Sequence, residues 1–448
     1  MSIRLADITT TLDYAKRNGL AAAYAAARER LSDRRVPYVY EPPGAAELAV
    51  QQEEMREARE KGHLPFISVV VPAWKTPEAF LNALRASLEA QSNEHYELII
   101  SEEPGGISAN TNAGIERARG DYIALLDHDD ILAPDALYHM ANAVMNAREE
   151  GIRPLLVYSD EDKFTEAVSD DGGSGLSFFA PNRKPDFNYD YLISNNYICH
   201  FTMIRADVLK KLKLRSEFDG AQDHDLFLRV FAEAEKAGQT AEAVDAQFVH
   251  VPRVLYHWRS HEASTAQSGA NKSYAHEAGR RAVAAHLRAR GINCAVEELP
   301  HRGFFRVNYF DGIFEARPDI GAVGGRLTDA RGRMRGGLYT ADEEILFDGL
   351  PRGASGGFTH RAACQQDADA VDLANMTIRP ELLDEIPAEL RPWLFADTSD
   401  FSDRRVRVRK SVLICGELRR KGYRILWDPM RQEVCETAGR RWTGSLKK

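Results

Sequence analysis

The chain has few cysteines, no long apolar run and no excess of positive charge. Its five cysteines form no C-x-x-C pair, so we expect neither a zinc cage nor a dithiol redox site. A sparse, odd set of thiols in a chain of 448 residues fits reduced cysteines in the cytoplasm. No apolar run approaches the ~18 residues that span a bilayer, and the first residues lack the apolar core of a secretory signal.

The net charge of -9 excludes the global basic field with which proteins attract nucleic acid, so no nucleic-acid partner is expected. Local basic clusters occur at Arg404–Lys410 and Arg419–Lys421. Such runs are usually solvated faces, and a contact of Arg404–Lys410 with anionic lipid or glycan is the alternative. The chain is about three times the ~150 residues of one domain, which predicts two or three domains.

Changes in composition suggest three parts. Residues 1–62 are predicted to form a helical appendage, because an alanine-rich stretch and a charged stretch flank a proline-rich break. Residues 63–298 begin with buried apolar runs that are typical of strands. Residues 299–448 form a separate, smaller region.

Strands and helices are predicted to alternate after residue 65. Phe66–Val71, Tyr96–Ile100 and Tyr122–Leu126 are apolar runs of strand length, and helical spacing separates them over 77–91 and 110–118. This alternation is the pattern of a doubly wound α/β sheet. Ligands of such sheets sit at the carboxyl ends of the strands.

The alternation continues less regularly to residue 290. Residues 165–186 are rich in Gly, Ser, Asp and Pro and are expected to form a loop. The other expected elements are a helix from Pro134, a short strand Val157–Ser159, a helix Leu226–Ala237, a strand Phe248–Trp258 and a helix His276–Arg290.

An acidic cluster directly follows the third predicted strand. Asp127, Asp129 and Asp130 place three carboxylates within four residues, where they repel one another. A divalent cation such as Mg²⁺ or Mn²⁺ would relieve this repulsion, because hard cations bind carboxylate and phosphate oxygens. The alternative is that Asp129 or Asp130 caps the helix that begins near Pro134.

Two later segments carry residues suited to transfer chemistry. Asp223 and Asp225 lie at the start of a helix, where either a general base or an N-cap is expected. Arg259 and His261 follow a strand, and their charge and hydrogen bonds suit a diphosphate. The alternative for this segment is a strand edge whose aromatic residues face the core.

Together these pieces resemble the family 2 glycosyltransferases of the GT-A fold, in the order and spacing of bacterial members that build cell-surface polysaccharides. The likeness covers about 65–290 and implies a Rossmann-like, mostly parallel, doubly wound sheet. An N-terminal helical segment and a smaller C-terminal α/β region would flank it. The segments that carry the resemblance are 67–91, 105–138, 158–163, 184–200 with 217–230, and 251–266.

The resemblance assigns roles by position. Asp127 and Asp129 match the D-x-D motif, which holds the ribose and a Mg²⁺ or Mn²⁺ ion bound to the diphosphate. Asp223 matches the catalytic base, with Gln222 in place of the usual Glu. The other implied donor contacts are Pro72 and Trp74 at the base, Glu102 in place of a base-reading Asp, Arg259 and His261 near the diphosphate, and Asp160, Glu161 and Asp162 at the donor sugar or acceptor.

The implied function is inverting, metal-dependent transfer of a sugar from a nucleotide-diphospho-sugar to a hydroxyl of a glycan or lipid-linked acceptor. That work fits a cytoplasmic protein, peripheral at the inner membrane surface, and leaves the oligomeric state open. Two alternatives remain: a nucleotidyltransferase, and an inactive glycan- or partner-binding module. The inactive module is supported by a shortened loop, where Glu102-Glu103-Pro104 replaces the family's Asp-Asp-Gly-Ser. In a further departure, Thr111 stands where the family often has an Arg that contacts phosphate.

The last part, 299–448, resembles the segments that follow the D-x-D of a family 2 domain. Too few residues lie between Phe304 and Ile320 for a nucleotide-binding half, and no D-x-D occurs there. We therefore expect a degenerate second transferase-like half-domain without an active site. Asp397, Asp400 and Asp403 lie where a second base region would be.

Overall fold

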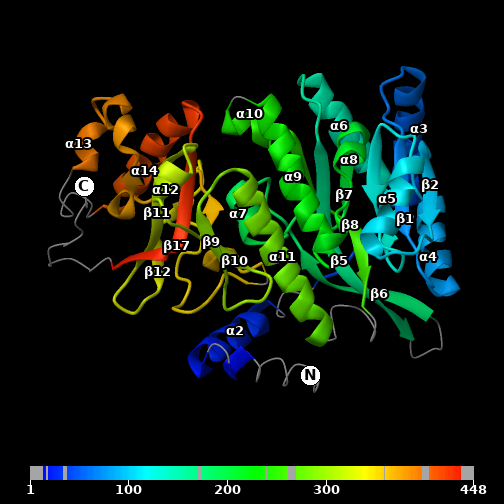
Figure 1. Ribbon diagram of the computed structural model, residues 1–448, viewed down its shortest axis with the longest axis horizontal. Coiled ribbons are helices and arrows are strands. Elements are labelled where there is room, and N and C mark those ends of the chain that lie inside the picture. The colour runs from blue at the N-terminus through cyan, green and yellow to red at the C-terminus, as the bar shows by residue number, and fades with distance from the viewer. Residues whose placement is uncertain are drawn as a thin grey trace. The chain divides into compact units, whose positions relative to one another are not determined.

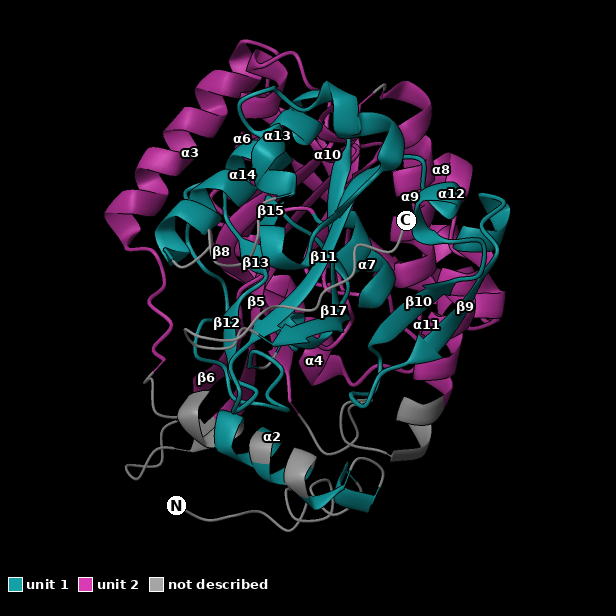
Figure 2. Cartoon of the chain, turned by 90° about the vertical axis from the view of Figure 1, so that its left-hand side faces the viewer, with its two compact units in different colours: residues 1–36, 188–195, 287–448 teal, residues 37–187, 196–286 magenta. Residues whose placement is uncertain are grey.

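The chain divides into two compact units in the computed structural model (Figure 2). Unit 1 comprises residues 1–36, 188–195 and 287–448, and unit 2 comprises residues 37–187 and 196–286. The three predicted parts, 1–62, 63–298 and 299–448, stay a prediction. The structure describes residues 14–16, 19–33, 38–168, 174–238, 240–260, 269–357, 359–395 and 403–434.

Two helices lie among the described residues of 1–62, as predicted. Figure 1 labels helices α2 (Leu20–Asp33) and α3 (Ala45–Glu60), and Figure 2 shows α2 in the colour of unit 1 and α3 in the colour of unit 2. Met55 of α3 is buried in the core of unit 2, and Gln51 accepts a hydrogen bond of 2.7 Å from the Ser92 hydroxyl. Helix α3 is therefore part of the packing of unit 2.

Unit 2 is built on a mixed sheet in the strand order β2-β1-β3-β7-β5-β8-β4, with β6 paired to β5. The pairs β1–β2, β1–β3 and β5–β8 are parallel, and the others are antiparallel. Strands β1, β2, β3, β5 and β8 thus run in one direction, which confirms the predicted α/β class. The strands are β1 (Ile67–Pro72), β2 (Tyr96–Ser101), β3 (Tyr122–Leu125), β4 (Ile131–Leu132), β5 (Leu156–Val168), β6 (Ser174–Asn182), β7 (Thr202–Arg205) and β8 (Phe248–Arg259).

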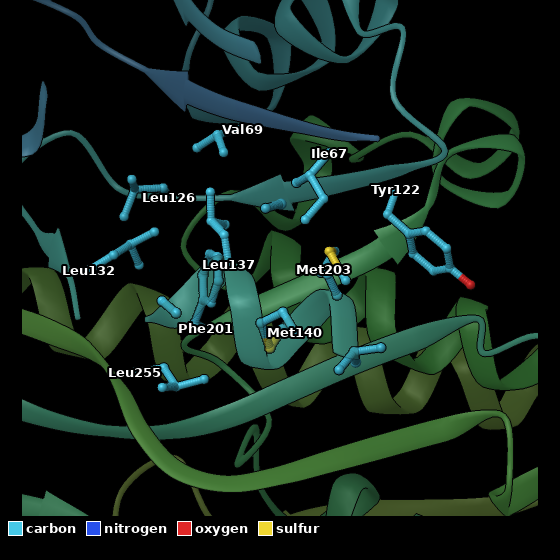
Figure 3. Packing of buried hydrophobic residues seen from close by; sticks show 14 of the residues in the cluster. Ile67, Val69, Tyr122, Leu126, Leu132, Leu137, Met140, Phe201, Met203 and Leu255 are labelled. Carbon is cyan, nitrogen blue, oxygen red and sulfur yellow. The ribbon is translucent and has the colours of Figure 1, made fainter. Parts of the chain in front are cut away.

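Helices complete the core of unit 2. Leu137, Met140 and Val144 of α6 recur at helical spacing, and all three are fully buried with Ile67 and Met203 of the sheet (Figure 3). All six residues of β1 are buried, as expected for a central strand covered on both faces. The helices are α4 (Glu78–Glu89), α5 (Ile107–Arg117), α6 (Ala136–Glu149), α8 (Ala206–Leu212), α9 (Gln222–Ala237), α10 (Ala241–Asp245) and α11 (Gly269–Ala289), with a 3-10 turn at Ser216–Phe218.

One predicted element of unit 2 is wrong. Residues 165–186 were expected to form a loop, but β5 extends to Val168 and pairs with β6 in an antiparallel hairpin. Phe178 of β6 packs against the rings of Tyr40 and His257, with centroids 4.8 and 4.6 Å away. Tertiary packing therefore overrides the turn-rich composition of this segment.

Unit 1 contains a smaller α/β region, as predicted. Its central strands β11 (Ile320–Thr328) and β17 (Arg424–Val434) are parallel, and α14 (Arg404–Arg420) packs on them through Ile414 and Leu418. The sheet order is β12-β11-β17-β14, with β16 paired to β11. The remaining elements are α7 (Tyr189–Ser194), β9 (Cys294–Glu298), β10 (Phe305–Tyr309), α12 (Ile313–Ala316), β12 (Met334–Gly336), β13 (Leu338–Tyr339), β14 (Gln366–Asp367), β15 (Ala370–Val371), β16 (Thr377–Ile378), α13 (Arg391–Leu394) and 3-10 turns at Arg361–Ala363, Leu373–Asn375 and Pro380–Glu385.

Of the three acidic residues assigned to a second base region, Asp403 lies among the described residues. Asp403 is the N-cap of α14, and its carboxylate accepts a hydrogen bond of 2.9 Å from the backbone N–H of Arg405. Asp397 and Asp400 lie outside the described residues. The half-domain interpretation of 299–448 stays a prediction.

The basic cluster Arg404–Lys410 begins α14, and part of it is structural. Arg407 is buried and pairs with Asp372 at 3.0 Å, and Arg404 pairs with Asp348 at 2.7 Å. These two cations are therefore compensated within unit 1. No helix in the described part of the chain is long and apolar enough to cross a membrane.

Helix α7 comes from the middle of the chain but belongs to unit 1. The Asn188 amide donates to the carbonyl of Asp367 at 2.9 Å, and the N–H of Asp367 donates back at 2.9 Å. Asp190 pairs with both terminal nitrogens of Arg317 at 2.7 and 3.1 Å. Arg317 also binds Asp319 at 2.8 and 2.7 Å and has no exposed surface, so two carboxylates share one buried cation.

Arg317→Met should destabilise the protein by about 3–5 kcal/mol, because it leaves the buried Asp190 carboxylate without its cation. Urea unfolding of the full chain measures the effect. Arg335→Met is the matched control, since Arg335 is 37% exposed, and it should change stability by about 0.5 kcal/mol or less. Equal stabilities of the two variants would show that the Asp190–Arg317 pair does not hold α7.

Candidate active site

The ends of three adjacent parallel strands form one edge of the unit 2 sheet. Pro72 ends β1 opposite the last residue of β2, and Asp127 follows β3. Trp74 is 52% exposed just beyond β1, and Glu102 is exposed just beyond β2. The structure therefore brings Pro72, Trp74, Glu102 and Asp127 to the same edge, as the strand order predicts.

The loop after β3 is anchored through its third aspartate. Asp130 is fully buried and accepts hydrogen bonds from the Tyr256 hydroxyl and, at 2.7 Å, from the backbone N–H of Arg259. The carbonyl of Asp129 accepts a hydrogen bond of 2.6 Å from Nε of Arg259. The capping alternative is wrong, because the N-cap of α6 is Asp135 and no side chain caps that helix.

Arg259 holds this loop from the end of β8. Its guanidinium lies 4.6 Å from the ring centroids of both Phe80 and Phe164 and binds Glu166 at 2.7 Å. Only 4% of the residue is exposed, so its charge is largely engaged inside unit 2. A diphosphate contact by Arg259 stays a prediction, and His261 lies outside the described residues.

Asp127 lies in an acidic environment. Removal from water raises the pKa of its carboxyl, His200 opposes this change, and the charges of Asp129 and Asp223 add to it. The distance from Asp127 Oδ2 to His200 Nε2 is 3.6 Å, and the Asp127 side chain is 41% exposed. Three carboxylates from β3 and α9 therefore act on one region, which favours a cation there.

Asp223 sits in the first turn of α9. The helix N-cap is Ala221, so the N-cap alternative for Asp223 is wrong. One carboxylate oxygen accepts a hydrogen bond of 3.0 Å from the Asn196 amide, and the other accepts one of 2.9 Å from the N–H of His224. These neutral donors orient a partly exposed carboxylate without neutralising it.

Asp225 has a different environment from Asp223. It is buried and pairs with Arg215 Nε at 3.0 Å and with Arg229 Nη2 at 2.8 Å. Both of its oxygens are therefore engaged with cations. Asp225 is a structural residue of α9 and is not available as a base.

The three consecutive acids of β5, Asp160, Glu161 and Asp162, are also buried and internally paired. A register shift occurs on each side of Asp160, where β5 pairs with β8. Their contacts with a donor sugar or acceptor stay a prediction. The pairs are Asp160 with His250 at 2.9 Å, Glu161 with Asn182 at 3.0 Å and Lys184 at 3.7 Å, and Asp162 with His257 at 2.6 Å and Tyr38 at 2.7 Å.

Asn196 and His200 were not predicted as site residues. Both lie between α7 and β7, and each contacts one of the candidate carboxylates, Asp223 and Asp127. Burial raises the pKa of the Cys199 thiol between them, and Asp223 adds to that shift. The signal for these residues was their place in the segment 184–200, which carries part of the family resemblance.

The acidic loop fits a divalent cation. Asp127 and Asp129 supply carboxylate oxygens, the ligands that Mg²⁺ and Mn²⁺ prefer. The described residues contain no group of three His, Cys, Asp or Glu side chains placed to hold a metal ion. Two carboxylates suffice for Mg²⁺ when phosphate oxygens and water complete its shell.

Comparisons with known proteins support the predicted family. Residues 86–213 match the model of glycosyl transferase family 2, so this segment is similar to the family 2 glycosyltransferases. The match includes Asp127, Asp129 and the acids of β5, whereas Asp223 and Arg259 lie beyond it.

Two curated relatives and one solved structure illustrate the likeness. The chain is 35% identical over 252 residues to the uncharacterized protein y4gI of Sinorhizobium fredii, covering 50% of this chain and 25% of that protein. It is 30% identical over 294 residues to the O-antigen biosynthesis protein RfbC of Myxococcus xanthus, covering 57% of this chain and 21% of that protein. The chain thus spans a quarter or less of these relatives. A solved structure, the crystal structure of S. aureus TarS 1-349 in complex with UDP-GlcNAc, has 12% sequence identity to this chain. The match covers 49% of this chain and 66% of that chain, and its TM-score of 0.34 is too low to support an argument.

The environments of Asp223 and Asp225 predict that their replacement by Asn has unequal effects on stability. Asp225→Asn should destabilise the protein by about 2–4 kcal/mol, below the full value for a buried pair because Arg215 is 39% exposed. Asp223→Asn should change stability by about 0.5 kcal/mol or less, since the amide oxygen still accepts from the His224 N–H and the NH2 group can donate to Asn196 Oδ1 once the Asn196 amide turns over. Chemical unfolding of both variants tests this, and a larger loss for Asp223→Asn would reverse the two assignments.

Proposed function

We propose that the protein is an inverting, metal-dependent glycosyltransferase that moves a sugar from a nucleotide-diphospho-sugar to a hydroxyl of a glycan or lipid-linked acceptor. The observation that carries the proposal is that the carboxylates of Asp129 and Asp223 act on Asp127, which follows β3 within the segment that matches family 2. Similarity to a relative named as an O-antigen biosynthesis protein supports a role in cell-surface polysaccharide synthesis.

The strand ends supply groups that suit a nucleotide. The exposed indole of Trp74 offers a face on which a base can stack. The exposed carboxylate of Glu102 can accept hydrogen bonds from base N–H groups, and Asp127 can accept from ribose hydroxyls. Pro72 is the last residue of β1 at that edge. In this proposal these four residues bind and orient the donor.

The carboxylates of Asp129 and Asp127 would hold Mg²⁺ or Mn²⁺. The bound cation supplies positive charge that offsets the charge developing on the leaving diphosphate. Arg259 contributes indirectly, because its hydrogen bond to the Asp129 carbonyl fixes the loop that presents these carboxylates. Preorganised charge of this kind needs no rearrangement during the reaction.

Asp223 is the proposed general base. Its carboxylate takes the proton of the acceptor hydroxyl while that oxygen forms a bond to the anomeric carbon. The bond from the anomeric carbon to the diphosphate breaks on the opposite face, which inverts the configuration. Asn196 and His224 hold the carboxylate in place through one hydrogen bond to each oxygen. In this proposal the acids of β5 border the donor sugar.

Asp129→Ala should abolish most Mn²⁺-dependent donor binding while the fold stays intact. A thermal-shift screen of nucleotide-sugars, with and without Mn²⁺, measures this, since ligand at 100 times its Kd adds about 2.7 kcal/mol of stability. Asp121→Ala is the matched control, because Asp121 is an exposed acid at the opposite end of β3, where it accepts a hydrogen bond from the N–H of Phe66. Unchanged metal-dependent binding by folded Asp129→Ala would contradict the metal assignment, and no binding by the parent would favour the inactive module.

Asp223→Asn should lower turnover by about 10²–10⁴ because the amide cannot accept the proton. Donor affinity should change little, since the base acts on the acceptor. Glu217→Gln is the control, an exposed acid close to α9 in sequence, and it should retain parental turnover. Near-normal turnover of Asp223→Asn would remove it as the base, and release of pyrophosphate in place of nucleoside diphosphate would identify a nucleotidyltransferase.

A further inference from the structure

Within unit 1, the loop Ser355–Gly357 binds the carboxylate of Glu29 on α2. The backbone N–H of Ser355 donates to its two oxygens at 3.0 and 3.1 Å, and the Ser355 hydroxyl donates at 3.0 Å. The N–H groups of Gly356 and Gly357 donate to Oε1 at 3.0 and 3.5 Å. Three consecutive backbone N–H groups that converge on one carboxylate form an anion-binding nest.

The shape of this loop is set by its own packing in unit 1. Gly356 and Gly357 have φ values of +86° and +82°, a conformation that favours glycine. A Cβ on Gly356 would lie 3.0 Å from both Ala362 and Phe347, so the backbone is closely packed there. Ser355 is 2% exposed. The nest is therefore built by unit 1 and is not merely a response to Glu29.

The surroundings of the nest also favour an anion. The Ser355 hydroxyl lies 2.7 Å from Nδ1 of His360, whose ring stacks on His301 at 3.7 Å. Burial lowers the pKa of the Arg326 guanidinium, and the charges of Cys364 and Glu29 oppose that shift, which places Arg326 in the field of the carboxylate. Nε of Arg326 is buried and has no hydrogen-bond partner among the described residues.

Helix α2 provides a weak anchor for this carboxylate. Leu20 and Tyr24 are 83% and 71% exposed, so these two apolar side chains do not fix the helix to unit 1. Ala23 is its one buried hydrophobic residue among those whose side chains are described. Among the described side chains of α2, Glu29 adds five hydrogen bonds to this one buried apolar contact.

We propose that the Ser355–Gly357 nest is a binding site for a phosphate group, and that Glu29 fills it as a displaceable internal occupant. A phosphate presents three acceptor oxygens and up to two negative charges, against two oxygens and one charge for Glu29. It can therefore engage the same donors more strongly and draw on Arg326 as well. The site lies in unit 1 and is independent of the proposed transferase activity.

The test measures binding of inorganic phosphate to the full-length protein by calorimetry, without divalent metal. Glu29→Gln and Glu29→Ala should bind phosphate at least about tenfold more tightly than the parent, because the competing charge is removed. Arg28→Ala changes an exposed residue of the same helix and should bind like the parent. Adding Ser355→Ala to Glu29→Ala should weaken binding about tenfold, since one donor to a charged group is lost.

Two further probes define the ligand. Tighter binding of a sugar phosphate than of inorganic phosphate would assign the site to phosphate esters, and the reverse would assign it to free phosphate. Tighter binding of acetate than of phosphate would overturn the phosphate assignment.

Three results would refute the site itself. They are equal phosphate affinity of the Glu29 variants and the parent, binding that is insensitive to Ser355→Ala, and loss of cooperative unfolding in both Glu29 variants. The last result would make Glu29 a structural residue. Donor turnover is not part of the readout, so failure here leaves the transferase proposal untouched.

Discussion

The buried carboxylate of Asp130 fixes the position of the acidic loop on which the candidate site depends. It accepts from the Tyr256 hydroxyl and the Arg259 backbone, which ties the end of β3 to the end of β8. Burial, together with the charges of Asp129 and Asp127, holds the pKa of this carboxyl well above its usual range. Asp130 thus anchors the loop, whereas Asp127 and Asp129 stay partly exposed at the edge of the sheet.

The partners of each acid separate structural from chemically available carboxylates. Asp225 lies between two arginines, Asp160 binds His250, and Asp190 shares a buried arginine. The oxygens of a carboxylate paired in this way are occupied by its partners, so they are not available to a substrate hydroxyl. Asp223 differs because the amide of Asn196 and the backbone N–H of His224, both neutral donors, hydrogen-bond to its carboxylate. That contrast favours it as the base more strongly than its position in the sequence does.

Local patterns in the sequence predicted the central strands and the acidic loop well, because continuous apolar runs and strand-end acids are local signals. The cap interpretations of the acidic residues failed because the partners of Asp130 lie 126 and 129 residues further along the chain. The hairpin of β5 and β6 was missed because Phe178 is held by distant rings. Asn196 and His200 had no spacing of their own to mark them. Contacts of this range are set by tertiary packing, which a single sequence does not display.

The membership of α7 in unit 1 constrains how the chain folds as it is synthesised. Tyr189 and Tyr191 are almost fully buried, yet Arg317 and Arg424, which lie over the Tyr189 ring, are made more than one hundred residues later. The apolar face of α7 therefore leaves the ribosome long before its partners and stays uncovered until β17 is made. Such transiently exposed surface promotes aggregation. A nascent chain that is stalled or cut before β17 would thus expose the aggregation-prone helix α7 in its middle. The need for chaperones should therefore depend on the length of chain between α7 and the C-terminal strands.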